Sequence, residues 1–324
     1  MRDTAGNPKV SVVMPAYNHA PYVARGIRSV LEQTYDNIQL VVVDDGSTDG
    51  TWKEIERAQR EARRPFLAIK QENRGICGAL NRGIAATDGE FIAAIASDDY
   101  FLPRKIERQV AVFRSSTESV ALVHTSAYLD YQDGCDLEDL TGSYSPAEGQ
   151  CFDRVIAQEV RVIAPSMVFR RSAYVAIGGF DDGLAADDVD FFIRLSGAGY
   201  EFAYVPEPLL VKTVVERSAG SNLRTLIGVH ERILDKQRYR LSDERYELLR
   251  AAMYDQFVVL AASAGDLRLA GGTAVRLARE RRSVGPLMHC TFWSLRGALL
   301  RALPRGTRHR MRLIRSRLRR AWTR

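Results

Sequence analysis

The sequence lacks the features that mark membrane-spanning, secreted or disulfide-stabilised proteins. It has no run of about 18 apolar residues, and its longest largely apolar stretch, Phe257 to Ala264, is too short to cross a bilayer. Met1 to Pro8 lack the apolar segment of a secretory signal. The four cysteines lie far apart, without metal-binding or disulfide spacing. We therefore expect a cytosolic protein with reduced thiols.

The fingerprints of several common enzyme classes are also missing. No Gly-x-Gly-x-x-Gly follows the first strand-like segment, which disfavours a dinucleotide-binding dehydrogenase, and no Gly-x-x-x-x-Gly-Lys-Ser/Thr indicates a P-loop ATPase. A serine nucleophile elbow is absent as well. The histidines share no metal-binding spacing, so each is expected to be a surface or core residue: His19, His124, His230, His289 and His309.

Acidic residues and lysine are absent from Arg296 to Arg324, a segment that holds eleven arginines. The rest of the chain keeps 35 of the 46 basic residues against all 40 acidic ones, so a mildly acidic body precedes a strongly basic tail. Such a separation indicates an anionic partner for the tail, either phospholipid or nucleic acid. The 324-residue chain, with 46% hydrophobic residues, is long enough for a substantial core and about two domains.

Strand and helix periodicities alternate through the first hundred residues. Four strand-like runs are separated by segments with apolar residues at helical spacing; the runs are Val10 to Met14, Leu40 to Val43, Phe66 to Lys70 and Phe91 to Ile95. This alternation predicts an α/β fold with a parallel, twisted sheet.

The pattern changes in the second half of the chain. We expect a short strand at Val120 to His124, an acidic loop over Tyr128 to Glu148, a strand at Ser166 to Phe169 and a strand pair within Glu201 to Val215. Only helical patterns follow Ser221, which places a domain boundary near residue 222. The expected domains are therefore residues 1–222 and 223–324.

Two acidic clusters follow strand-like runs, Asp44-Asp45 after the second and Ser97-Asp98-Asp99 after the fourth. Ligands of parallel sheets bind beyond the carboxyl ends of the strands, and neighbouring buried carboxylates repel each other unless a cation or donors compensate. Oxygen-only ligands favour Mg²⁺ or Mn²⁺. Each cluster alone is equally compatible with turn or helix-cap chemistry.

Several blocks, taken in order, resemble the inverting family 2 glycosyltransferases. The resemblance covers residues 9–215, and the blocks are Val10 to Asn18, Val43 to Asp49, Asn73 to Gly75, Asn81 to Gly83, Ala96 to Asp99, Gly178 to Asp181 and Asp187-Asp188. It implies a GT-A fold, a Rossmann-like, mostly parallel sheet flanked by helices, here followed by a helical C-terminal region. It also implies a hexosyltransferase-type enzyme that uses a nucleotide-diphospho-sugar donor.

The resemblance assigns a nucleotide pocket to the first blocks. Asp45 would hydrogen-bond the base, since a carboxylate suits an imide N–H, while Pro15, Ala16 and Tyr17 would form the pocket wall. Arg74 would lie near the nucleotide and offset phosphate or carboxylate charge. An exposed surface arginine is the alternative for Arg74.

The later blocks are assigned to the metal and to catalysis. Ser97-Asp98-Asp99 resembles the family's DXD metal motif, with Asp99 as ligand of Mg²⁺ or Mn²⁺ and Asp98 facing the sugar or ribose. Asp187-Asp188 resembles a Glu-Asp pair whose second residue is the general base, so Asp188 would deprotonate the acceptor hydroxyl. Without the other blocks, this pair would be interpreted as a helix cap.

Two family features are missing. No Gln-x-x-Arg-Trp follows Asp188, which argues against processive polymer synthesis, and no tyrosine-arginine-x-histidine stretch is recognisable in Val211 to Ser221. Two rival interpretations remain. The first is a nucleotidyltransferase, but the glycine-rich phosphate loop of that class is missing from this sequence. The second is a non-catalytic, membrane-associated nucleotide-sugar-binding protein, whose function would not need Asp188.

The basic tail has apolar residues at helical spacing, namely Met311, Ile314, Leu318 and Trp322. This pattern predicts a basic amphipathic helix on an anionic membrane surface, and a lipid-linked or glycan acceptor would explain it. Packing of the tail on the protein is the alternative, and no nucleic-acid partner is expected. We therefore expect a cytoplasmic enzyme of cell-envelope polysaccharide or glycolipid assembly, peripheral at the inner face of the membrane.

Overall fold

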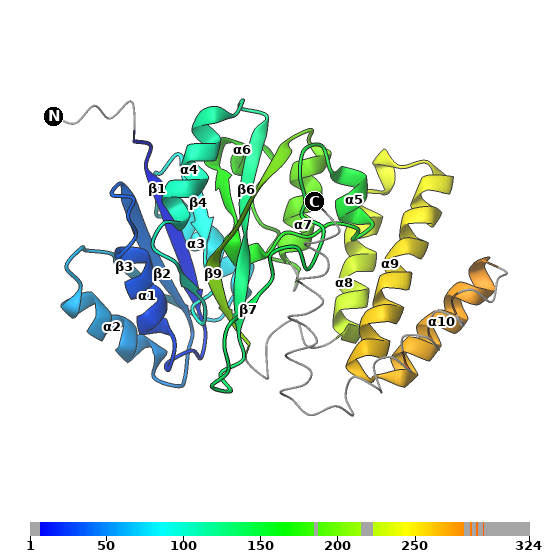
Figure 1. The fold of residues 1–324 in the computed structure, drawn as a ribbon, viewed down its shortest axis with the longest axis horizontal. Coiled ribbons are helices and arrows are strands. Elements are labelled where there is room, and N and C mark those ends of the chain that lie inside the picture. The colour runs from blue at the N-terminus through cyan, green and yellow to red at the C-terminus, as the bar shows by residue number, and fades with distance from the viewer. Residues whose placement is uncertain are drawn as a thin grey trace. The chain divides into compact units, whose positions relative to one another are not determined.

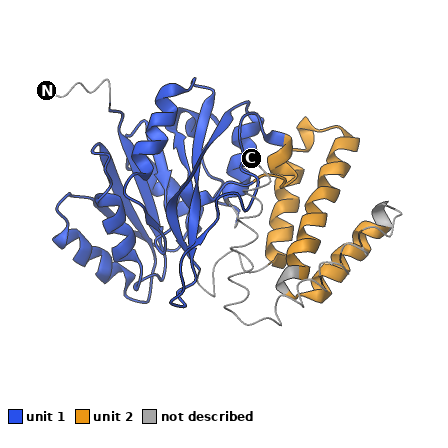
Figure 2. Ribbon diagram, viewed as in Figure 1, with its two compact units in different colours: residues 1–152, 161–215 blue, residues 153–160, 216–324 orange. Residues whose placement is uncertain are grey.

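The computed structural model describes residues 7–184, 187–214 and 223–281, together with residues 286, 290 and 294. The chain forms two compact units, one of residues 1–152 and 161–215 and one of residues 153–160 and 216–324 (Figure 2). The boundary expected near residue 222 lies outside the described residues, as does the basic tail, Arg296 to Arg324.

The described residues of the first unit contain one nine-stranded sheet, in the order β3-β2-β1-β4-β8-β6-β9-β5, with β7 paired to β6 (Figure 1). The neighbours β3, β2, β1 and β4 are parallel, and β6 is parallel to β9, whereas β8 is antiparallel to both β4 and β6. The strands are β1 Val10–Ala16, β2 Ile38–Asp45, β3 Leu67–Gln71, β4 Phe91–Ala94, β5 Tyr100–Phe101, β6 Val120–Asp130, β7 Glu138–Asp139, β8 Val168–Arg170 and β9 Glu201–Thr213.

Helices cover both faces of this sheet. The helices of this unit are α1 Val23–Leu31, α2 Thr51–Glu61, α3 Gly75–Ala85, α4 Lys105–Ser115, α6 Arg171–Ala176 and α7 Asp187–Gly197. The short helix α5 Phe152–Ile156 belongs, apart from Phe152, to the second unit. Apolar side chains of α1, α2 and α4 pack on one face against Val12, Met14 and Val42. On the other face α3 approaches so closely that a Cβ on Gly83 would lie 2.4 Å from Cγ1 of Val13, so this position requires glycine.

The α/β fold with a mostly parallel sheet flanked by helices is confirmed, but the second half of the sheet differs in detail. The strand expected at Val120 to His124 is present but longer than expected, because β6 continues to Asp130 and pairs with β9 up to Thr213. Tyr128 therefore belongs to a strand and not to the acidic loop. The expected strand pair within Glu201 to Val215 is a single long strand, β9.

The expected strand at Ser166 to Phe169 begins two residues later. A 3₁₀ turn at Ala164–Ser166, with Pro165 in its first positions, precedes β8. Proline suits the first turn of such a helix because it has no N–H to donate.

The described residues of the second unit after residue 222 form helices and turns, with no strand among them. The unit contains α8 Leu223–Lys236, a 3₁₀ turn at Arg238–Arg240, α9 Asp243–Ala264 and α10 Leu267–Arg281. The Ser242 side chain accepts a hydrogen bond from the Arg245 amide at the start of α9, and Gly265 (φ 90°) ends it. Its core includes Tyr254, Phe257 and Leu277. None of the helices in the described part of the chain is long and apolar enough to cross a membrane.

Candidate active site

The site is built where the parallel strands end. Ala16 at the end of β1 lies opposite Asp44 of β2, and β4 pairs with the other side of β1. Because these strands are parallel, the loops after β1, β2 and β4 leave the same edge of the sheet. The strand order reverses between β1 and β4, and in open α/β sheets ligands bind outside the carboxyl ends of the strands at such a switch point.

The loops after β1 and β2 are joined by backbone-to-side-chain hydrogen bonds. The Asn18 amide donates to Ser47 Oγ (3.0 Å), and the Thr48 amide donates to Asn18 Oδ1 (2.9 Å). The His19 amide donates to Thr51 Oγ1 (2.8 Å), and the Ala20 amide donates to Asp49 (3.1 Å). Asn18 has a left-handed backbone (φ 54°), a conformation that asparagine tolerates better than most residues. The two loops therefore form one connected frame.

This frame places the expected pocket-wall residues. Pro15 and Ala16 are buried at the end of β1, whereas the next residue, Tyr17, is 47% exposed. An aromatic side chain this exposed contributes little to the core, so it is available to contact a ligand.

Asp44 and Asp45 are adjacent in sequence but point to opposite faces of β2, as strand geometry requires. Asp45 is 3% exposed, and its Oδ1 accepts hydrogen bonds from Gln71 Nε2 and from the Arg74 amide, both at 2.8 Å. The carboxylate of Asp45 is thus fixed between β2, β3 and the start of α3. Asp44 is fully buried, and within the described part of the chain neither of its carboxylate oxygens has a hydrogen-bond partner.

Asp99 is the most perturbed carboxylate of the site. It is fully buried, and its Oδ1 accepts a hydrogen bond from the Thr213 amide (2.9 Å) at the end of β9. Its Oδ2 has no hydrogen-bond partner among the described residues. Burial raises the pKa of Asp99 to about 7, although Lys212, whose Nζ lies 4.0 Å from Oδ2, opposes the shift.

His19 is a site residue that the sequence did not reveal. Its Nδ1 shares a hydrogen bond with Ser97 Oγ (2.8 Å) and lies 3.9 Å from Asp98 Oδ1. His19, expected as a surface or core residue, is half-buried and contacts the Ser97-Asp98-Asp99 segment. His124 is a core residue, as expected, since it is fully buried, bonds the Ala147 carbonyl and has its pKa lowered to about 4 by burial.

The glycine-rich turn before α7 is fastened to α3. Asn81 donates to the Phe180 carbonyl (2.9 Å) and accepts from Tyr174 Oη (2.7 Å). Gly179 has φ 77°, and a Cβ there would lie 2.9 Å from Tyr174 Oη, so both its conformation and its surroundings require glycine. Arg74, the residue before α3, forms an ion pair with Asp182 of this turn (3.6 Å), and both side chains are more than half exposed.

Asp188 lies in the first turn of α7 and is half-buried, and its Oδ1 accepts a hydrogen bond from the Val189 amide (2.9 Å). Asp190 has a different environment, because it is fully buried and accepts a 2.6 Å hydrogen bond from Arg194. Of these two carboxylates, Asp188 is the one accessible to solvent. The side chain of Asp187 lies outside the described residues.

The residues present fit a divalent metal that protein and ligand hold together. Within the described residues, no three His, Cys, Asp or Glu side chains form a complete metal cluster. The buried Oδ2 of Asp99 accepts no hydrogen bond among the described residues and has Lys212 Nζ 4.0 Å away, and a cation would satisfy such an oxygen more closely. Mg²⁺ and Mn²⁺ sites often take only one or two carboxylates and complete their shell with phosphates and water.

Comparison with known proteins identifies the family of the chain. Residues 11–177, just over half of the chain, match the family model described as glycosyl transferase family 2. A glycosyltransferase of Nostoc sp. is 43% identical over 128 residues, which cover 40% of this chain and 38% of that protein. A glycosyltransferase of Rickettsia typhi is 29% identical over 232 residues, 68% of this chain and 69% of that protein.

Solved structures share the fold at low sequence identity. A mannosyltransferase from Pyrobaculum calidifontis, in complex with GDP-Man and Mn²⁺, has a TM-score of 0.62 at 19% identity and covers 98% of this chain and 88% of its own. Residues 1–349 of TarS from S. aureus, in complex with UDP-GlcNAc, have a TM-score of 0.63 at 16% identity and cover 89% of each chain. With the family model matched from β1 to the end of α6, the chain belongs to glycosyltransferase family 2.

Proposed function

We propose that this glycosyltransferase moves one sugar from a nucleotide-diphospho-sugar to an acceptor hydroxyl, with inversion, and with Asp99 and a divalent metal holding the diphosphate. The observation that carries the proposal is Asp99 itself. A fully buried carboxylate whose pKa stays raised despite Lys212, and whose Oδ2 accepts no hydrogen bond, is costly, and a bound cation would relieve that cost at the edge of the sheet where ligands bind.

The nucleotide would bind over the connected loops after β1 and β2. Asp45 Oδ1 already accepts two N–H groups, so Oδ2 is the acceptor we assign to an N–H of the base. Tyr17 would cover the base, because its ring is exposed at the pocket mouth. Arg74 would leave its ion pair with the exposed Asp182 and pair with a phosphate of the bound nucleotide instead.

The diphosphate would lie near Asp98 and Asp99. When bound, a metal supplies positive charge where negative charge develops on the departing diphosphate. Asp99 would hold it through Oδ2, since Oδ1 is engaged by the Thr213 amide. Asp98, only 8% exposed and beside His19, would face the ribose or sugar.

Asp188 would act as the general base. Its carboxylate would accept the proton of the acceptor hydroxyl while that oxygen forms a bond to the anomeric carbon. The bond from the anomeric carbon to the diphosphate breaks on the opposite face, and its electron pair leaves with the diphosphate. One displacement of this kind inverts the anomeric configuration.

Two features of the sequence indicate the class of acceptor: the arginine-rich tail and the absence of the processivity motif. Phe191 to Leu195 replace the Gln-x-x-Arg-Trp of processive enzymes, so one sugar would be added per encounter. An arginine-rich tail would hold the enzyme at the anionic inner face of the membrane, where each arginine contributes about 1 kcal/mol. A glycan or lipid-linked acceptor of the cell envelope would be met there.

The test is nucleoside diphosphate release from UDP-, GDP- and dTDP-sugars, with membrane extract as acceptor source and Mn²⁺ or EDTA added. Release that EDTA abolishes, with inverted product by NMR, supports the proposal. Donor binding without turnover would instead favour a non-catalytic nucleotide-sugar-binding protein. Deleting Arg296 to Arg324 tests the tail, because the truncated chain should no longer sediment with anionic liposomes.

A further inference from the structure

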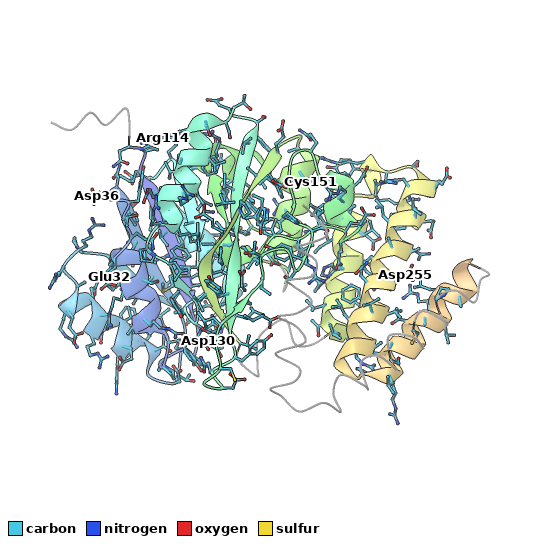
Figure 3. The ribbon with its side chains drawn as sticks, in the orientation of Figure 1. Glu32, Asp36, Arg114, Asp130, Cys151 and Asp255 are labelled. Carbon is cyan, nitrogen blue, oxygen red and sulfur yellow. The ribbon has the colours of Figure 1, made fainter. Side chains whose placement is uncertain are left out.

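Arg25, in the first turn of α1, lies at the junction of four segments that surround Asp99. Its Nη2 donates to Thr213 Oγ1 (2.9 Å) at the end of β9 and reaches the Asp98 carbonyl (3.5 Å). Its Nη1 is 3.8 Å from the carboxylate of Asp130 at the end of β6, which is labelled in Figure 3. The guanidinium also stacks 4.3 Å from the ring centroid of Tyr100 in β5.

Thr213 connects this arginine to the metal-binding carboxylate. Thr213 is 2% exposed; its hydroxyl accepts from Arg25 and donates to the Asp98 carbonyl (2.6 Å), and its amide donates to Asp99 Oδ1. One residue therefore fixes the backbone of Asp98 and the side chain of Asp99. Moving Thr213 would rotate or release the Asp99 carboxylate.

The helix that carries Arg25 is placed to act on this junction. A Cβ on Gly26 would lie 3.1 Å from the Asp99 carbonyl, so α1 is packed directly against the Asp98–Asp99 segment. Lysine could supply the charge of Arg25, but only the planar fork of an arginine can reach Thr213, the Asp98 carbonyl and Asp130 at once.

We propose that Arg25 is a positioning residue for the metal: through Thr213 it holds Asp99 with Oδ2 directed to the cation. The inference rests on the proposed function, in which Asp99 binds the metal. Arg25 itself touches neither the metal nor the sugar, and it acts by joining α1 to the ends of β6 and β9.

The test measures Mn²⁺ affinity by electron paramagnetic resonance in the presence of GDP or UDP. This measurement needs no turnover. Residues that orient a metal ligand typically change metal affinity by about 10- to 100-fold when mutated. We expect Arg25→Gln to weaken Mn²⁺ binding about tenfold and Arg25→Lys to restore little of it. The matched control is Arg28→Gln, which removes the same charge from an exposed position on α1, and it should bind Mn²⁺ as the wild type does.

A mutant cycle with Thr213→Val separates positioning through Thr213 from a general loss of charge. If Arg25 acts through Thr213, the double variant should bind Mn²⁺ no more weakly than Thr213→Val alone. Unchanged Mn²⁺ affinity in Arg25→Gln, or additive losses in the double variant, would overturn the inference. Circular dichroism shows whether Arg25→Gln is folded. If it is not, the Mn²⁺ affinities of Thr213→Val and Thr213→Ser are compared instead, and equal affinities would overturn the inference. Wild-type protein that binds no Mn²⁺ with either nucleotide would refute the proposed function instead.

Discussion

Replacing Asp99 by asparagine should stabilise the metal-free protein while removing its metal site. Asp99 is fully buried, and burial raises its pKa from 3.8 to about 7. Between these two values the folded protein holds a proton that the unfolded chain releases, so stability falls as the pH rises. Each pH unit in this window costs about 1.4 kcal/mol, and the full shift corresponds to about 4 kcal/mol above pH 7.

Asparagine does not titrate, so Asp99→Asn should escape this loss. The difference in unfolding free energy between the variant and the wild type should grow by about 2 kcal/mol from pH 5 to pH 7 and level off near pH 8. Urea or thermal unfolding in EDTA at pH 5 to 8 measures it. Asp88→Asn is the control, because Lys9 lowers the pKa of that exposed carboxyl and its titration is complete below this range. A stability difference for Asp99→Asn that does not vary with pH would refute the reasoning.

Three further substitutions probe the nucleotide pocket and the sheet. Asp45→Asn should weaken nucleoside diphosphate binding about tenfold by calorimetry, since hydrogen bonds to charged groups contribute about 1.5–3 kcal/mol; unchanged affinity would contradict its role. Tyr17→Ala should reduce the same affinity without lowering the melting temperature, because the ring is 47% exposed, and a lower melting temperature would indicate a core role. Gly83→Ala should destabilise the fold by about 1–3 kcal/mol in urea unfolding, because its Cβ would overlap Val13; wild-type stability would show that α3 can move away.

The first half of the fold was predictable because its signals are local. Largely apolar runs such as Val10 to Met14 and Leu40 to Val43 are typical of buried strands, and turn residues such as Asp88-Gly89 separate helix from strand. The extension of β6 to Asp130 was not predictable in this way. Its last residues are polar or half-buried, and they are extended because β9 pairs with them.

The residues of the candidate site were likewise predictable only where their sequence signals are local. Asp45, Asp98 and Asp99 were expected because they follow strand ends within ordered motifs. His19, Arg25, Lys212 and Thr213 were not, because each reaches the carboxylates through a contact between distant segments, such as the 114-residue separation of Thr213 and Asp99. No short-range pattern carries that information.

Asp99 is proposed to bind the metal, and Asp188 to accept the proton of the acceptor hydroxyl. Both roles are tested by comparing nucleoside diphosphate release and donor binding in the wild type, Asp99→Ala and Asp188→Asn, with Mn²⁺ and a responsive acceptor. We expect Asp188→Asn to lose about 10²- to 10⁴-fold in kcat yet to bind donor as the wild type does, whereas Asp99→Ala should lose both turnover and Mn²⁺-dependent binding. Wild-type turnover in Asp188→Asn, or Mn²⁺-dependent turnover in Asp99→Ala, would contradict these roles.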